Sequence, residues 1–100
     1  MKIAIIDDEP KELRLLASLM KQQLSAFGYT ENVIDYFYSG EEFLAAFRPG
    51  RYELILLDIY MGRMSGIDTA RKIRKQDPEV FLVFSTSSNE FASESYEVNA

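Results

Sequence analysis

Acidic residues follow two apolar runs of the sequence and could together bind a cation. Asp7, Asp8 and Glu9 end the run KIAII, and Asp58 ends the run ELILL. Two carboxylates about 4 Å apart repel each other by roughly 4 kcal/mol at an effective dielectric near 20, so such a cluster needs solvent or a cation. Mg²⁺ suits it, because this ion takes oxygen ligands octahedrally and keeps several waters. An aspartate beside the ion could then attack a phosphoryl group as a nucleophile.

The composition excludes several other kinds of chemistry. The 100 residues include no cysteine and no histidine, which rules out disulfides, thiol nucleophiles, cysteine zinc sites and Ser/His catalysis within them. No segment approaches the ~20 apolar residues of a membrane span, and the first apolar run is too short for a signal peptide. The net charge of −5, without a basic stripe, gives no electrostatic case for nucleic-acid binding. We therefore expect a soluble cytoplasmic protein with one domain over residues 1–100.

Strand-like apolar runs alternate with helical patterns along the chain. Strands are predicted for residues 2–7, 32–38, 52–59 and 80–86. Helices are predicted from Pro10 to near Gly28, from the capping box of Ser39 and Glu42 to the turn at 48–51, from about Gly66 to Lys75, and from a second capping box at Ser87 and Glu90 through Val98. This alternation is typical of βαβ units and a parallel sheet.

A doubly wound sheet would bring the polar strand ends together. Ligands bind such sheets beyond the carboxyl ends of the strands, where the strand order reverses. With the order 2-1-3-4, that point lies between the first and third strands, where Asp7 and Asp8 meet Asp58. The fourth strand ends beside them, in the hydroxyls of Ser85, Thr86 and Ser87. The pattern favours a magnesium site over the alternative that these acids merely end strands in solvent.

With these motifs in view, the sequence resembles the receiver domain of two-component response regulators over essentially its whole length. The resemblance is carried by IIDDE at 5–9, LLDIYMGRMSG at 56–66 and FST at 84–86. It implies an α/β, flavodoxin-like doubly wound parallel sheet with strand order 2-1-3-4. It also implies a signalling domain rather than an enzyme. Such a domain takes a phosphoryl group from the phosphohistidine of a histidine kinase, and it catalyses only its own phosphotransfer and dephosphorylation.

The resemblance assigns roles to individual residues. Asp58 is the phosphoacceptor by this correspondence. Asp8 is a direct Mg²⁺ ligand, Asp7 acts mainly through bound water, and the backbone carbonyl of Tyr60 completes the protein ligands. Thr86 matches the hydroxyl that moves toward the phosphoryl oxygens, and Ser87 matches the small residue that leaves the phosphoryl group accessible.

The last residues of the chain suggest the output. The segment NEFASESYEVNA, at 89–100, resembles receivers that precede a LytTR-type DNA-binding domain. The complete protein is then expected to regulate transcription, with its DNA contacts in a domain absent from this chain. Phosphorylation is expected to shift Thr86 and the surface around the fourth strand and last helix.

The sequence departs from the receiver pattern in two places. Gly62 replaces the usual proline after Met61. The family's lysine at the end of a fifth strand has no counterpart, so we expect a C-terminally incomplete receiver, truncated before the fifth strand and fifth helix. The apolar run 80–86 makes a poor natural edge strand, which predicts a homodimer through the fourth strand and last helix.

Two other functions fit part of the pattern. A Mg²⁺-dependent phosphatase of the haloacid dehalogenase type also uses an aspartyl nucleophile, but it places a second aspartate where this chain has Tyr60. A receiver-like binding module that signals without phosphorylation is favoured by the absent lysine. Retention of Asp8, Asp58 and Thr86 together argues against the second of these alternatives.

Overall fold

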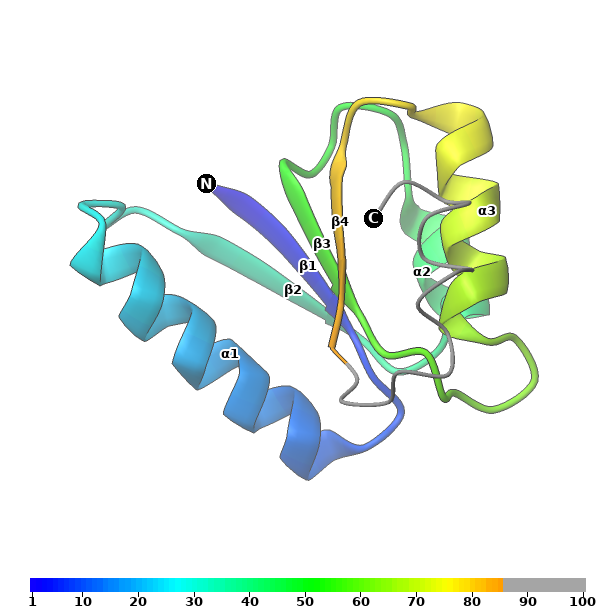
Figure 1. Cartoon of the computed structure of the whole chain (residues 1–100), viewed down its shortest axis with the longest axis horizontal. Coiled ribbons are helices and arrows are strands. Elements are labelled where there is room, and N and C mark those ends of the chain that lie inside the picture. The colour runs from blue at the N-terminus through cyan, green and yellow to red at the C-terminus, as the bar shows by residue number, and fades with distance from the viewer. Residues whose placement is uncertain (86–100) are drawn as a thin grey trace.

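The computed structural model describes residues 1–85, so the predicted last helix, Thr86 and Ser87 lie outside the described residues. Within the described part, strands and helices alternate as the sequence predicts (Figure 1). They are β1 (Lys2–Ile6), α1 (Pro10–Ala26), β2 (Val33–Phe37), α2 (Gly40–Ala46), β3 (Leu54–Leu57), α3 (Gly66–Gln76) and β4 (Phe81–Phe84). None of the helices within residues 1–85 is long and apolar enough to cross a membrane.

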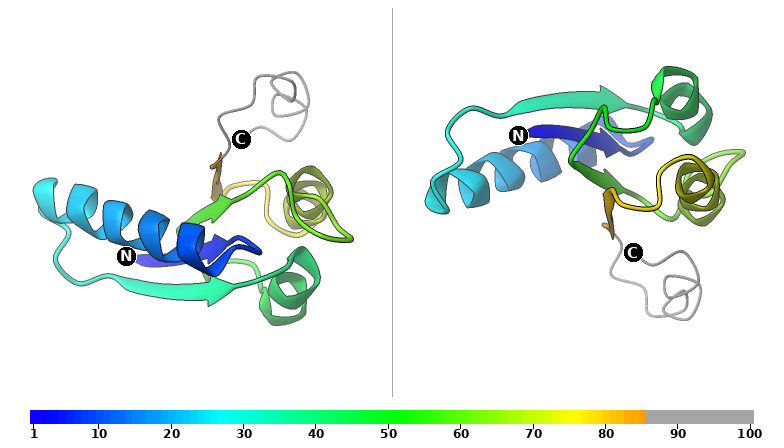
Figure 2. Two further views of the ribbon diagram at one scale, coloured as in Figure 1. Left: turned by 90° about the horizontal axis from the view of Figure 1, so that it is seen from below. Right: turned by 90° about the horizontal axis from the view of Figure 1, so that it is seen from above.

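The strands form a parallel sheet in the order β2-β1-β3-β4, which confirms the predicted order. Helix α1 covers one face of this sheet, while α2 and α3 cover the other (Figure 2). Alternate residues of β1 supply the two cores, because successive side chains of a strand point to opposite faces. Ile3 and Ile5 pack with Leu13 and Ala17 of α1, whereas Ala4 and Ile6 belong to the core beneath α2 and α3.

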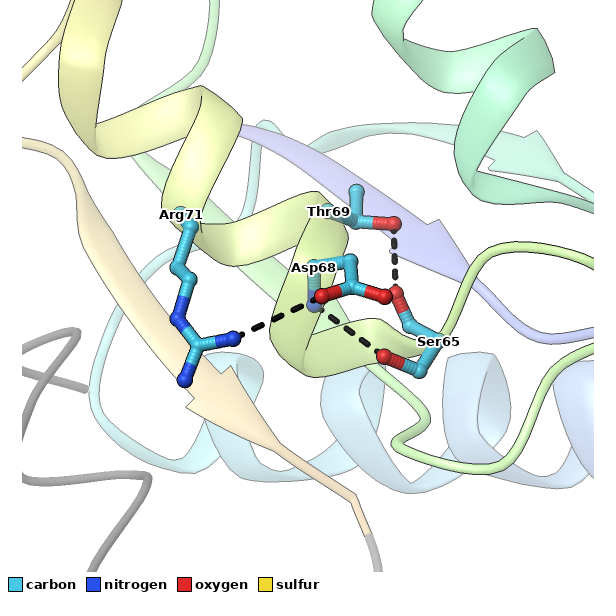
Figure 3. Close-up of polar contacts among 4 residues, drawn as sticks. All are labelled: Ser65, Asp68, Thr69 and Arg71. Carbon is cyan, nitrogen blue, oxygen red and sulfur yellow. Dashed lines mark hydrogen bonds and ion pairs between the residues drawn. The ribbon is translucent and has the colours of Figure 1, made fainter.

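Side-chain caps set where α2 and α3 begin. The Ser39 hydroxyl accepts a hydrogen bond from the Glu42 N–H at 3.0 Å, which confirms half of the predicted capping box. In α3, which follows the loop after β3, the Ser65 hydroxyl accepts from the Asp68 N–H at 3.1 Å (Figure 3). The Thr69 hydroxyl also donates to the Ser65 carbonyl at 2.8 Å. These contacts fix the loop between β3 and α3 at the point where it enters α3.

Asp77 joins the loop before β3 to the loop before β4, at the end of the sheet opposite the acidic strand ends. One carboxylate oxygen accepts from the N–H groups of Glu79 and Val80 at 3.0 and 3.1 Å, and the other accepts from the Gly50 N–H at 3.2 Å. Burial opposes ionisation of this carboxyl, but the three N–H groups and Arg74 outweigh it. The pKa of Asp77 therefore lies below its ordinary value.

Replacing Asp77 by alanine is expected to lower the free energy of unfolding by about 2–3 kcal/mol, because three backbone donors lose a charged acceptor. Asp68→Ala, which removes an exposed carboxylate on α3, should cost less than about 1 kcal/mol and serves as the matched control. Urea titrations of both variants measure the difference.

The stabilising effect of Asp77 should also depend on pH. Because the pKa of Asp77 is lowered on folding, its contribution to the free energy of unfolding is present at neutral pH and is lost as pH falls through the folded-state pKa. A variant that unfolds at the wild-type urea concentration would contradict this assignment.

Candidate functional site

The sheet brings the three predicted acids together. Asp7 follows β1 and donates its N–H to the Phe37 carbonyl, and Asp58 follows β3 and donates its N–H to the Ile6 carbonyl, both at 3.0 Å. These bonds continue the strand ladders by one residue and fix both backbones. Carboxylate oxygens of Asp7, Asp8 and Asp58 all lie within 4.8 Å of one another. The predicted meeting of the first and third strand ends is therefore confirmed.

An open depression of about 540 Å³ surrounds these acids. The fourth strand reaches it through Ser85, whose N–H donates to the Leu57 carbonyl at 3.0 Å. Tyr60 lines the depression from the loop after β3, and the first turn of α1 contributes further charged side chains. Those side chains are Lys11 and Glu12, which the sequence analysis did not place in the site; Glu9, just before the helix, lines it as well.

The three acids differ in exposure and in hydrogen bonding. Asp7 is 1% exposed, Asp58 is half-buried and Asp8 is exposed. One oxygen of Asp7 accepts from the Glu9 N–H at 2.9 Å, and one oxygen of Asp58 accepts from the Tyr60 N–H at 3.3 Å. These local bonds orient the Asp7 and Asp58 carboxylates.

Burial makes the ionised forms of Asp7 and Asp58 unfavourable. It raises the pKa of Asp7 to about 6 against the opposing hydrogen bond from Glu9, and the negative charges of Asp58, Asp8 and Glu12 raise it further. Burial likewise raises the pKa of Asp58, and the charges of Asp8 and Glu12 add to this effect. A bound cation would relieve these costs. Oxygen-only donors in an open depression fit Mg²⁺, which retains water ligands.

Asp7→Asn is expected to raise the melting temperature of the metal-free protein at pH 7 by roughly 4–8 °C, which corresponds to about 1 kcal/mol for a domain of this size. The folded protein binds its Asp7 proton up to pH about 6. Stability of the metal-free wild type should therefore fall as pH rises from about 4 to about 6, and the variant should show a smaller fall, because it keeps the raised pKa of Asp58 but not that of Asp7. Thermal melts across this pH range measure both effects.

Asp8→Asn is the control for this prediction, because the exposed Asp8 carboxylate carries a smaller burial cost. The same melts with added Mg²⁺ should show less stabilisation for Asp7→Asn than for the wild type. A metal-free Asp7→Asn protein that melts below the wild type would contradict this prediction, because it would show that the Asp7 carboxylate stabilises the fold.

Gly66 lets α3 begin directly against the backbone of Asp58. Its N–H donates to the Ile59 carbonyl at 2.8 Å. A Cβ atom at position 66 would overlap the carbonyl group of Asp58. The close turn after the acid therefore requires a residue without a side chain. By contrast, a Cβ atom at Gly62, in the same loop, would meet no atom within 4 Å.

Comparisons with known proteins identify a family and relatives for this chain. A family model described as the response regulator receiver domain matches residues 3–100. The chain is 37% identical over 100 residues to the sensory transduction protein LytR of Staphylococcus haemolyticus and 31% identical over 100 residues to the positive alginate biosynthesis regulatory protein of Pseudomonas aeruginosa. Both matches cover 100% of this chain but only 37% and 39% of those proteins. The chain thus spans less than half the length of these relatives.

Solved structures share the fold. The BeF3-activated receiver domain of DrrB, a Thermotoga maritima protein, superposes with a TM-score of 0.76 at 28% identity, over 99% of this chain and 78% of that one. The response regulator TrrA of Thermotoga maritima has been solved in complex with Mg(2+)-BeF, with a TM-score of 0.71 at 31% identity over 95% of this chain and 78% of that one. Another TrrA structure contains the histidine kinase ThkA. The flavodoxin-like sheet predicted from the sequence is confirmed.

Proposed function

The chain belongs to the response regulator receiver domain family, and from this premise we propose that Asp58 accepts a phosphoryl group from the phosphohistidine of a histidine kinase. The observation that carries the proposal is the position of Asp58. Its half-buried carboxylate lies at the end of a central strand, within 4.8 Å of the carboxylates of Asp7 and Asp8, and lines an open depression.

Mg²⁺ is the proposed cofactor. Asp8 and Asp58 would hold it directly, Asp7 through water, and Tyr60 through its backbone carbonyl. When bound, the ion supplies charge neutralisation for the transferred phosphoryl group. The raised pKa values of Asp7 and Asp58 support a cation at this position, because removal from water makes both carboxylates costly to ionise without one.

In the proposed transfer, a carboxylate oxygen of Asp58 attacks the phosphorus atom. A new O–P bond forms, and the P–N bond of the phosphohistidine breaks with its electron pair left on the imidazole nitrogen. Hydrolysis later returns Asp58 to a carboxylate and releases inorganic phosphate. These two reactions are the only catalysis proposed for the domain. Thr86 is proposed to move toward the phosphoryl oxygens, and Ser87 to leave the phosphoryl group accessible.

The proposed output is control of transcription. The support is the similarity to two longer regulatory proteins, in which this region makes up 37% and 39% of the length. DNA contacts would then belong to a separate, LytTR-type domain, and the protein would act in the cytoplasm. The histidine kinase as partner is supported by the complex of TrrA with ThkA.

A homodimer through β4 and the last helix is also proposed. Phe81 and Val83 of β4 are 74% and 45% exposed, which leaves apolar surface beside the edge of the sheet. Sedimentation velocity at increasing protein concentration tests it, and a monomer at every concentration would exclude it.

Incubation with acetyl phosphate tests the central proposal. Intact-mass spectrometry should detect the gain of one phosphoryl group with Mg²⁺ present and little gain when EDTA removes the ion. Equal labelling in the two samples would exclude a metal-assisted transfer.

A further inference from the structure

The depression around Asp58 has an uneven charge. Among the described residues that line it, the acids are Asp7, Asp8, Glu9, Glu12 and Asp58, and the one base is Lys11. A phosphodonor is itself an anion, so these negative charges repel the donor as it approaches the Asp58 carboxylate. Even with a divalent cation bound, the formal charge of the lining stays negative. As the one base among these described lining residues, Lys11 can offset part of the repulsion felt by a donor.

Lys11 is available for this role. It is exposed and is the second residue of α1, directly after Pro10. Within residues 1–85, Lys11 makes no ion pair with any carboxylate at 4 Å or less. Its long, flexible side chain can thus turn toward an anion that enters the depression.

Helix stability does not account for a lysine at this position. The N-terminus of a helix carries partial positive charge, which favours acidic residues and disfavours basic ones within the first turn. Glu12 follows that preference and Lys11 does not. Lys11 instead lines the same depression as Asp58, where a positive charge can act on an anionic ligand.

We propose that Lys11 binds the phosphoryl oxygens of the incoming donor and so assists transfer to Asp58. This inference rests on the proposed function of Asp58. It predicts opposite effects on two ligands of one site. The lysine attracts the anionic donor but repels Mg²⁺, so its removal should slow phosphorylation and at the same time tighten Mg²⁺ binding.

The test compares Lys11→Gln with the wild type at saturating Mg²⁺. The rate of phosphorylation by acetyl phosphate should fall about two- to sevenfold, and the loss should grow as ionic strength is lowered, because salt screens exposed charges. Phosphoramidate, a donor with less negative charge, should show a smaller loss. Isothermal titration should show Mg²⁺ bound about twofold more tightly by the variant.

Two further variants separate charge from structure. Lys11→Arg keeps the positive charge and should retain the wild-type rate. Lys21→Gln removes an exposed lysine about 15 Å further along the same helix and should change neither measurement.

Three results would overturn the inference: an unchanged rate for Lys11→Gln, a loss independent of ionic strength, or an equal loss for Lys21→Gln. In each of these cases the wild type is still phosphorylated, so the proposed function stands. A wild type that acetyl phosphate does not label would instead remove the proposed function and the role of Lys11 with it.

Discussion

Asp58→Asn is expected to abolish phosphorylation by acetyl phosphate, with a fall in rate of more than about 100-fold, as for the loss of an enzymatic nucleophile. An amide matches the carboxylate in shape and can still accept the Tyr60 N–H, but it lacks a nucleophilic oxygen. Intact-mass spectrometry after incubation with Mg²⁺ and acetyl phosphate measures the effect.

The fold should survive this substitution. Burial raises the pKa of Asp58, so a neutral amide at position 58 removes an unfavourable charge, and the metal-free variant should be at least as stable as the wild type. Asp68→Asn is the matched control, because it makes the same chemical change at an exposed carboxylate on α3 and should be labelled normally. Labelling of Asp58→Asn at the wild-type rate would exclude Asp58 as the acceptor.

Gly66→Ala is expected to lower the free energy of unfolding by about 2–3 kcal/mol, since the added methyl group overlaps the Asp58 carbonyl and the backbone must shift. Helix propensity alone would make the alanine variant more stable by up to about 1 kcal/mol. The expected loss of stability therefore runs against helix propensity. The melting temperature should fall by roughly 10 °C or more. Phosphorylation should also slow, because the backbone that has to move carries the nucleophile.

Gly62→Ala is the control for this prediction. It makes the same substitution in the same loop, where the new Cβ atom meets nothing within 4 Å. Stability and labelling of Gly62→Ala should stay close to those of the wild type. Equal stability of Gly66→Ala and the wild type would show that the loop after Asp58 does not require the close contact.

Much of the site could be predicted from local patterns. The acids follow continuous apolar runs, and parallel strands place their carboxyl ends at one edge of a sheet, so the meeting of Asp7, Asp8 and Asp58 follows from the strand order. The start of α2 was predictable as well, because the capping box of Ser39 and Glu42 lies within four consecutive residues.

Other features depend on contacts between distant segments. Asp77 bonds to Gly50 across 27 positions of the sequence, and no spacing within either loop indicates that bond. Lys11 lines the depression although no motif of the sequence marks it for a role there. Ser65 caps α3 ahead of an aspartate rather than the glutamate or glutamine of a capping box, so the usual signal is absent. The roles of Thr86 and Ser87 stay predictions.

Borohydride trapping tests the central claim most directly. Reduction of the phosphorylated protein converts an aspartyl phosphate to homoserine, and peptide mass spectrometry then identifies the modified position. We predict homoserine at position 58, with aspartate retained at positions 7 and 8, and no conversion in Asp58→Asn. Homoserine at another position, or a phosphorylated protein with aspartate intact at position 58, would contradict the assignment of Asp58 as the phosphoacceptor.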